Sequence, residues 1–119
     1  MQNQLSVQVV FNAQVIAKNG SAESGPIDLT YAGSNKSLQI HQAGDGTGKY
    51  EYLLSNDGVN FIVPEGGGTI VDGVTKTGGP GTDGKLIKPF TTGVAQAMKI
   101  RVTEADVEAI NVTAVLGVL

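Results

Sequence analysis

The side chains best able to do chemistry in this chain are eleven Asp and Glu residues and one histidine, His41. The absence of cysteine excludes disulfides, thiolate nucleophiles and zinc sites built on Cys. Carboxylates can act as general acid and base when a protein holds them together in a cleft. The spacing of the carboxylates puts no pair into one shared apolar cleft, so they do not by themselves predict a catalytic site.

His41 falls on the polar face of an alternating segment that begins at Ser37, and we expect an exposed side chain without a catalytic role. A Ser-His-Asp arrangement stays open, but no G-x-S-x-G nucleophile motif supports it. The Gly-rich segments EGGGTIVDG and TGGPGTDGK lack the G-x-x-x-x-G-K-[ST] pattern of a phosphate-binding loop. The sequence therefore predicts a protein that is not an enzyme, with no catalytic, cofactor-binding or metal-ligating residue.

Several of the carboxylates stand directly before a glycine. These pairs are Asp45-Gly46, Asp57-Gly58, Asp72-Gly73 and Asp83-Gly84. Asp accepts hydrogen bonds from nearby backbone N–H groups, and Gly adopts positive φ at little steric cost. A calcium site would need several oxygens that converge on one point, whereas the chain has no D-x-D-x-D-G run and its acids lie singly. We therefore expect turns at these pairs and no bound metal.

The segment YEYLLSNDGVNF, residues 50–61, shows the same signal next to polar side chains. Ser55 and Asn56 can form hydrogen bonds across a corner, and Asp57-Gly58 can reverse the chain. Phe61 is predicted to turn inward and cover the turn. The segment therefore predicts a folded corner between two strands and not a binding or catalytic site.

The elements that position these loops are short strands with an apolar residue at every second position. The strands predicted with most support cover residues 7–17, 27–31, 37–41, 49–54, 98–103 and 110–118, and weaker candidates cover 61–63, 69–72 and 85–90. Pro89 is compatible with an edge strand. TEADVEA, residues 103–109, is expected to be a polar connection between two strands, with a single helical turn as the alternative.

Low charge and abundant glycine agree with many short strands and tight turns. Charged residues make up 16% of the chain and Gly occupies 17 of 119 positions, against about 25% and about 7% in typical domains. We expect an all-β, antiparallel β-sandwich in one domain, residues 1–119, with residues 1–5 as an extended N-terminal arm. A jelly-roll-like fold or a small barrel is the neighbouring possibility.

The charge pattern and the N-terminus exclude several classes of partner. The net charge is −3 and the eight Lys and Arg residues are scattered, so we do not expect nucleic-acid binding. The first residues, MQNQLSVQVVFNAQ, do not form a signal peptide, and no apolar run approaches the roughly 20 residues of a membrane helix. A carbohydrate-binding β-sandwich is an alternative function, although the chain has no Trp to stack on a sugar.

Two longer segments carry a resemblance to a known class of proteins. SGPIDLTYAGSNKSLQIHQAGDGTGKYEYLLSNDGVNF and PFTTGVAQAMKIRVTEADVEAINVTAVLGVL resemble small virion structural proteins of tailed bacteriophages, and the resemblance covers residues 21–119. The shared features are an I-D-L strand, an S-L-Q-I strand, a G-x-G loop, a strand ending in S-x-D-G, and a G-x-A-x-x-x-x-I-R-V strand before an apolar last strand. Phe61 departs from the Trp that usually follows S-x-D-G.

The resemblance implies a structural protein of the virion, assembled in the host cytoplasm. A capsid decoration (cement) protein is the first interpretation, and a neck, tail or baseplate component is the alternative. The implied partners are the major capsid protein or neck and tail proteins, together with further copies of the chain as a homo-oligomer. The uncharged ending INVTAVLGVL leaves two alternatives: the last strand lies wholly in its own sheet, or its end packs against a neighbouring subunit.

Overall fold

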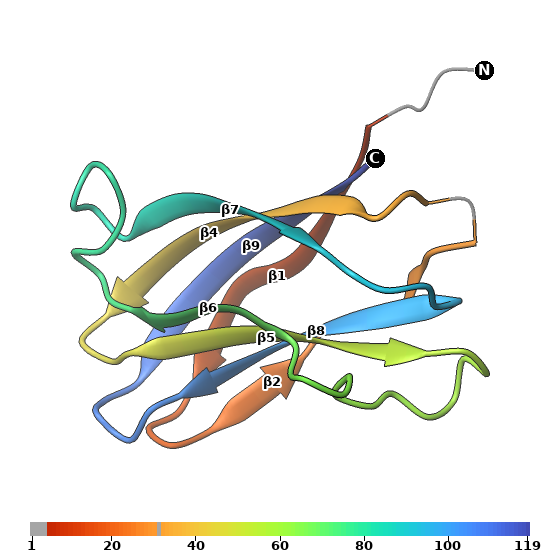
Figure 1. Cartoon of the computed structure of the whole chain (residues 1–119). Coiled ribbons are helices and arrows are strands. Elements are labelled where there is room, and N and C mark those ends of the chain that lie inside the picture. The colour runs from red at the N-terminus through yellow and green to blue at the C-terminus, as the bar shows by residue number, and fades with distance from the viewer. Residues whose placement is uncertain (1–4, 31) are drawn as a thin grey trace.

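Two antiparallel sheets pack face to face in the computed structural model, which describes residues 5–30 and 32–119 (Figure 1). Sheet A has the strand order β1-β9-β4-β7, and sheet B has the order β2-β8-β5-β6 with β3 beside β8. The strands are β1 (Ser6–Ile16), β2 (Ser21–Glu23), β3 (Ile27–Asp28), β4 (Asn35–Gly44), β5 (Gly48–Ser55), β6 (Thr69–Val74), β7 (Lys85–Thr91), β8 (Ala97–Glu104) and β9 (Ile110–Val118). The predicted all-β antiparallel sandwich is confirmed, and the two sheets do not close into a barrel.

The alternating strands build the core between the sheets. Leu38 and Ile40 of β4 point inward and are completely buried, as are Met98, Ile100 and Val102 of β8 in the opposite sheet. Burying each such side chain contributes about 1.5–3 kcal/mol relative to leaving it in water. The pattern of one buried residue in two, read along β4, β8 and β9, is thus the main source of stability.

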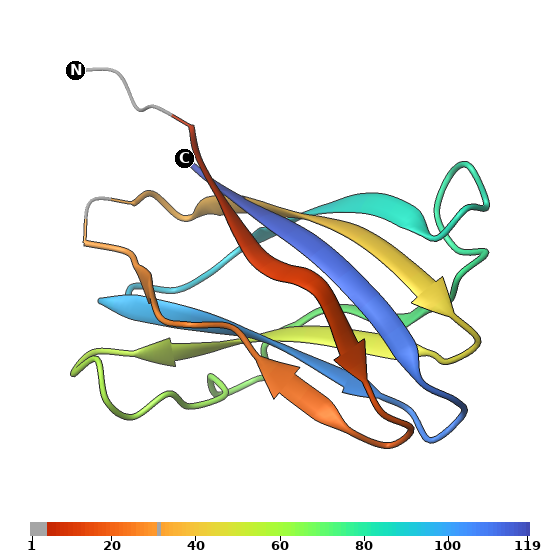
Figure 2. The same cartoon turned by 180° about the vertical axis from the view of Figure 1, so that it is seen from behind.

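The last strand lies inside its own sheet, between β1 and β4, as Figure 2 shows from behind. Leu119 extends this pairing, since its N–H donates to Asn35 O at 3.2 Å and its carbonyl accepts from Gly33 N at 2.8 Å. The last strand is therefore paired within its own sheet, as the first of the two alternatives for INVTAVLGVL predicts. A contact of its end with a neighbouring subunit stays a prediction.

Most predicted strands are found, with some changes in extent. Within the predicted strand 27–31, the described residues 27–30 contain the two-residue β3, and Tyr31 lies outside the described residues. The weak candidate 61–63 contributes a single bridge between Ile62 and Leu54. Pro89 lies on β7, which is an edge strand as expected. The segment 103–109 is the polar connection, because β8 ends at Glu104 and β9 begins at Ile110 without a helical turn.

One predicted turn is wrong. Asp72-Gly73 lies within β6, where Gly48 pairs with Val74 and Tyr50 pairs with Val71, so two residues of β6 oppose one residue of β5. Gly73 has φ +82°, which is the left-handed conformation expected of a bulge glycine. The Asp-Gly signal therefore marks a β-bulge here, because the same backbone conformation serves a turn and a bulge.

The expected alternation of β1 is also only partly correct. Phe11 and Ile16 are buried, but Val7, Val9 and Val15 are 61%, 58% and 63% exposed. The pairing with β9 shifts register between Val9 and Phe11 and again between Phe11 and Gln14. Each shift inserts a residue and changes which face the following side chains occupy, so the apolar residues of β1 are divided between the core and the surface.

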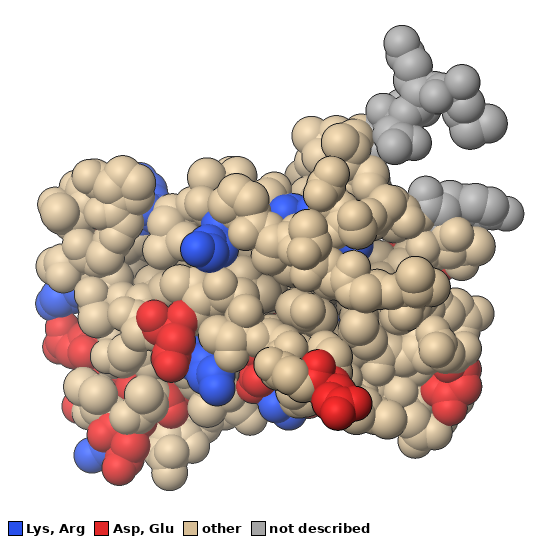
Figure 3. Space-filling view, in the orientation of Figure 1, with Lys and Arg blue, Asp and Glu red and all other residues tan. Residues whose placement is uncertain are grey.

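Charge is distributed unevenly between the two sheets. All eleven acidic residues lie outside the described strands of sheet A, in sheet B and in the loops. Most acidic side chains visible in Figure 3 accordingly lie in its lower half, over sheet B. Lys36, Lys85 and Lys88 are the charged residues of the sheet A strands, and Lys36 is buried, with its Nζ donating to Gly33 O at 2.8 Å.

Two further expectations concern the ends of the chain and membranes. The expected N-terminal arm, residues 1–5, lies outside the described residues except for Leu5, which precedes β1 and is 65% exposed. Across residues 5–30 and 32–119, no helix is both long enough and apolar enough to cross a membrane.

Candidate functional site

The corner after β5 is organised by Asp57. Its Oδ1 accepts hydrogen bonds from Val59 N at 2.9 Å, Asn60 N at 2.8 Å and Ser55 Oγ at 2.9 Å, and its Oδ2 accepts one from Asn60 Nδ2 at 2.8 Å. Gly58 has φ +74° and donates its N–H to Ser55 Oγ. The predicted folded corner is confirmed, with the Asp-Gly pair at the reversal and Ser55 across it.

These donors determine the chemistry that Asp57 can do. The backbone N–H groups of Asn60 and Val59, followed by the side chains of Asn60 and Ser55, hold the pKa of Asp57 well below its usual range. An ionised carboxylate cannot donate a proton, and both oxygens are already engaged within the corner. Asp57 therefore stabilises the loop and is poorly suited to general acid catalysis.

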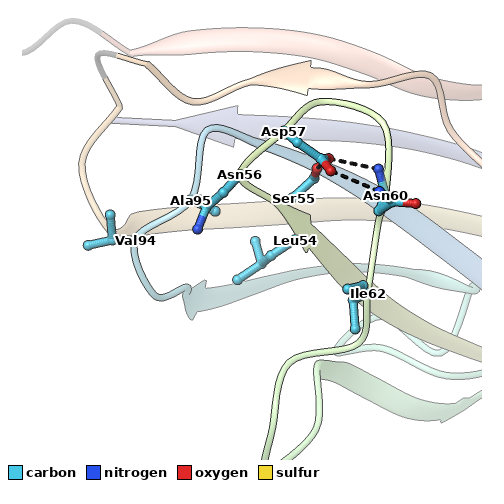
Figure 4. A pocket seen from close by; sticks show the side chains of 8 residues that line it. All are labelled: Leu54, Ser55, Asn56, Asp57, Asn60, Ile62, Val94 and Ala95. Carbon is cyan, nitrogen blue, oxygen red and sulfur yellow. Dashed lines mark hydrogen bonds between the residues drawn. The ribbon is translucent and has the colours of Figure 1, made fainter.

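Beside this corner lies a depression of about 510 Å³ (Figure 4). We call it the corner hollow, and its lining residues are Leu54, Ser55, Asn56, Asp57, Asn60, Ile62, Val94 and Ala95. Val94 comes from the β7–β8 loop and is fully exposed, and Ile62 is 66% exposed. The lining therefore combines exposed aliphatic side chains with the polar edge of the corner.

The corner hollow does not have the features of a sugar platform. Sugar-binding modules stack flat aromatic rings on the apolar faces of sugars, and none of the lining residues described is aromatic. The predicted inward turn of Phe61 is wrong, because its half-buried ring lies outside the core cluster, with Lys99 Nζ 4.6 Å from the ring centroid. Lys99 holds the ring on the outer face of sheet B by a cation–π contact.

His41 is exposed on β4, as predicted. It lines a second open depression of about 560 Å³, beside β7 and the β6–β7 loop, that also contains Asp83 and Lys85. Asp83 Oδ2 is 4.0 Å from Lys85 Nζ, a distance typical of a weak surface ion pair. His41 and the Asp57 corner belong to different sheets and line different depressions, so the structure does not combine them into one reactive site.

Among the described residues, no group of three or more His, Cys, Asp or Glu side chains could hold a metal ion. The acids that form networks do so with backbone donors instead. Glu104 is completely buried and accepts hydrogen bonds from the N–H groups of Asn19, Thr47 and Val107 at 2.9–3.1 Å. One carboxylate thus joins the β1–β2, β4–β5 and β8–β9 loops.

Burial alone would raise the pKa of Glu104. The backbone donors of Asn19, Thr47, Val107 and Glu108 outweigh that effect and lower the pKa of Glu104 to about 2. This network was not predicted, because its donors are backbone groups that come together only in the folded chain.

A second buried polar group also escaped the sequence interpretation. Gln42 is 1% exposed, and its Oε1 accepts a hydrogen bond from the hydroxyl of fully buried Tyr50 at 2.7 Å. Gln42 Nε2 donates to Val74 O at 2.6 Å, so the group connects β4 of sheet A with β5 and β6 of sheet B. The alternation that buries Leu38 and Ile40 places Gln42 at the next inward position, and that signal could have identified it.

The outer face of sheet A carries exposed apolar side chains on β1, β7 and β9 beside the polar side chains of β4. We call this the apolar face, and it consists of Leu5, Val7, Val9, Ile87, Pro89 and Val115. Val7, Val9 and Ile87 are each 58–62% exposed. Sequence reasoning missed this surface because the bulges of β1 put Val7 and Val9 outside, where a regular alternation with Phe11 would have placed them in the core.

Comparisons with known proteins give a fold but no family. No protein-family model matches the chain, and no curated protein matches it in sequence. Among solved structures, the protein of T=1 particles derived from infectious bursal virus is similar with a TM-score of 0.59 and 8% identity, over 98% of this chain and 31% of that chain. The chain therefore spans less than a third of the length of that viral protein.

Two other solved structures are similar to the chain in fold. Tripeptidyl peptidase 2 matches with a TM-score of 0.61 and 9% identity, over 98% of this chain and 10% of that chain. PliG of Aeromonas hydrophila, a periplasmic inhibitor of g-type lysozyme, matches with a TM-score of 0.52 and 8% identity, over 97% of this chain and 86% of that chain. The chain therefore has a β-sandwich fold that resembles viral capsid protein domains and also occurs in unrelated proteins.

Proposed function

We propose that the chain is a non-enzymatic structural protein of a tailed-phage particle, and that it decorates and stabilises the capsid. The observation that carries the proposal is the exposure of large aliphatic side chains on two separate surfaces, the apolar face and the corner hollow. A soluble monomer rarely exposes contiguous apolar patches without a partner. A protein that bridges neighbours in a shell needs more than one such surface.

The proposed mechanism is mechanical. Many copies would dock across the boundaries between capsid subunits, and each would bury a modest apolar area against its neighbours. Weak contacts gain strength when several act together on one lattice, because later contacts form at high effective concentration. The sum of these contacts would resist expansion of the packed head.

The resemblance to small virion proteins supports this proposal, and the fold, which viral capsid protein domains share, is compatible with it. Asp57 and Glu104 are occupied by hydrogen bonds that organise loops, and the corner hollow is lined by aliphatic and amide side chains. A neck, tail or baseplate component would use the same kind of surfaces. The place of the protein in the particle distinguishes these roles.

Immunogold electron microscopy of phage particles, with antibody raised against the chain, tests the proposal. A decoration protein should be labelled over the whole head, and particles assembled without it should release their DNA at a lower temperature. Label confined to the neck or tail would favour the alternative role. Particles without any label, and with unchanged thermal release of DNA, would reject the proposal.

A further inference from the structure

The apolar side chains of this face lie on β1, β9 and β7, while Ser37 and Gln39 occupy the outward positions of β4 between them. Side chains of directly paired residues in an antiparallel sheet point to the same face. One row across the sheet is therefore Val9, Val115, Gln39 and Ile87, and the adjacent row is Val7, Gly117, Ser37 and Pro89. A Cβ placed on Gly117 would lie 3.4 Å from Leu5 Cδ1, so Leu5 covers the gap that Gly117 leaves in this surface.

This face is the part of the molecule where two copies can meet without opposing negative charges. The chain has a net charge of −3, and none of its acidic residues lies on the described strands of sheet A. Lys85 is the charged residue of these strands that belongs to the outer face, since it pairs with the outward His41. Asp83 at the rim lies beside Lys85 and offsets its charge. In a twofold contact each patch meets its own copy, so a patch whose strands carry no acidic residue avoids repulsion between negative charges.

Contact through the face is favoured over pairing along the free edge of β1. An edge strand can add a second chain only where its backbone groups are regularly spaced. The edge of β1 is interrupted twice, between Val9 and Phe11 and between Phe11 and Gln14. Ala13, within the second interruption, adopts φ +50°. Such bulges twist an edge and limit strand addition. The flat side of the sheet carries no such interruption in β4 or β9.

The size of the face is sufficient for a weak dimer. Four strands spaced by about 4.8 Å, each about 30 Å long, present roughly 600 Å² in projection, and more when the relief of side chains is included. Stable interfaces bury about 600–1,000 Å² on each partner. A face of this size, with few charges, agrees with a contact near the lower limit of specific interfaces.

We propose that the apolar face of sheet A binds the same face of a second copy of this chain, giving a twofold dimer of stacked sheets. The inference concerns an intersubunit contact that leaves the corner hollow of each copy free. The dimer is argued from the surface of the chain alone. A chain that stays monomeric could therefore still decorate a capsid, and a chain that forms the dimer could still lack a role in the particle.

Sedimentation velocity of the full chain over a range of concentrations tests the dimer. The unmodified chain, 12.2 kDa as a monomer, should associate to twice that mass with a dissociation constant on the order of 10 µM, as expected for a small interface. Val9→Lys should raise that constant at least about tenfold, because the twofold contact would bury two new charges. The matched control is Val59→Lys, which places the same charge on a valine that is 77% exposed and belongs neither to the apolar face nor to the lining of the corner hollow.

Far-UV circular dichroism and the melting temperature of each variant show whether folding is retained. If Val9→Lys unfolds the chain, Val7→Lys on the same face replaces it. A wild-type chain that stays monomeric up to about 100 µM, roughly ten times the expected constant, would overturn the proposal. So would a dimer that Val59→Lys weakens as much as Val9→Lys and Val7→Lys do, or a dimer that neither variant of the apolar face affects.

Discussion

Replacing Gln42 by Leu should destabilise the sandwich more than a loss of packing alone would. The change keeps a side chain of similar size but removes the acceptor of the Tyr50 hydroxyl and the side-chain donor to Val74 O. Both side chains are buried, so water cannot replace the lost partners. Burial also raises the pKa of Tyr50, so its hydroxyl stays protonated at neutral pH and still requires an acceptor.

The cost can be worked from these contacts. Each buried polar group left without a partner costs about 1–3 kcal/mol, so Gln42→Leu should lower the free energy of unfolding by about 3 kcal/mol. A chain of 119 residues has an entropy of unfolding near 250 cal/mol/K at its midpoint, so 1 kcal/mol corresponds to about 4 °C. The melting temperature should therefore fall by about 12 °C.

Tyr50→Phe and the double variant complete a thermodynamic cycle measured by urea unfolding. Tyr50→Phe should cost about 1–2 kcal/mol, because Gln42 Oε1 loses its donor. The double variant Gln42→Leu with Tyr50→Phe removes donor and acceptor together, and its cost should be smaller than the sum of the single costs by at least about 1 kcal/mol. Additive costs would refute the argument, since they would mean that the hydroxyl and the amide do not interact energetically.

Three further predictions follow from single residues. The pKa of Glu104 is near 2 in the folded chain against an ordinary value of 4.5, so its stabilising effect is complete above pH 4.5 and disappears as the pH falls toward 2. Glu104→Gln should therefore make the free energy of unfolding depend less on pH in this acidic range. An unchanged dependence would contradict this prediction. Gly46→Ala should lower the melting temperature strongly, because a Cβ there meets Glu108 O, whereas Gly25→Ala has open space and should be nearly neutral. Asp57→Ala should lower the melting temperature and accelerate proteolysis within the corner, and protection equal to the wild type would show that its hydrogen bonds are dispensable.

Local patterns in the sequence predict most of the fold. The strong alternation of β4, β5, β8 and β9 identifies the central strands of both sheets and the side chains between them. The Asp57 corner is predictable for the same reason, because the hydrogen bonds of the Asp57 carboxylate and of Ser55 Oγ join residues 55–60. Where the determining interactions are close in sequence, residue type and spacing are sufficient.

The parts that were missed depend on pairing between distant segments. β2, with the sequence SAE, has little apolar pattern of its own and exists because Ser21, Ala22 and Glu23 pair with β8. The register shifts of β1 depend on its partner β9 and decide that Val7 and Val9 face outward. The apolar face could therefore not be predicted from the sequence, because the apolar residues of β1 alternate there as they would in a regular strand.

The carboxylate of Glu104 has a consequence for how the molecule opens. Asn19, Thr47 and Val107 belong to three loops that are far apart in sequence and share this one acceptor. If one loop moves away, its amide donates to water instead of Glu104. The carboxylate is then stabilised by fewer donors, which makes the opening of the other two loops easier. Amide protons at these three positions should accordingly exchange with deuterium at a common rate, as one cooperative unit at the end of the sandwich opposite the Asp57 corner.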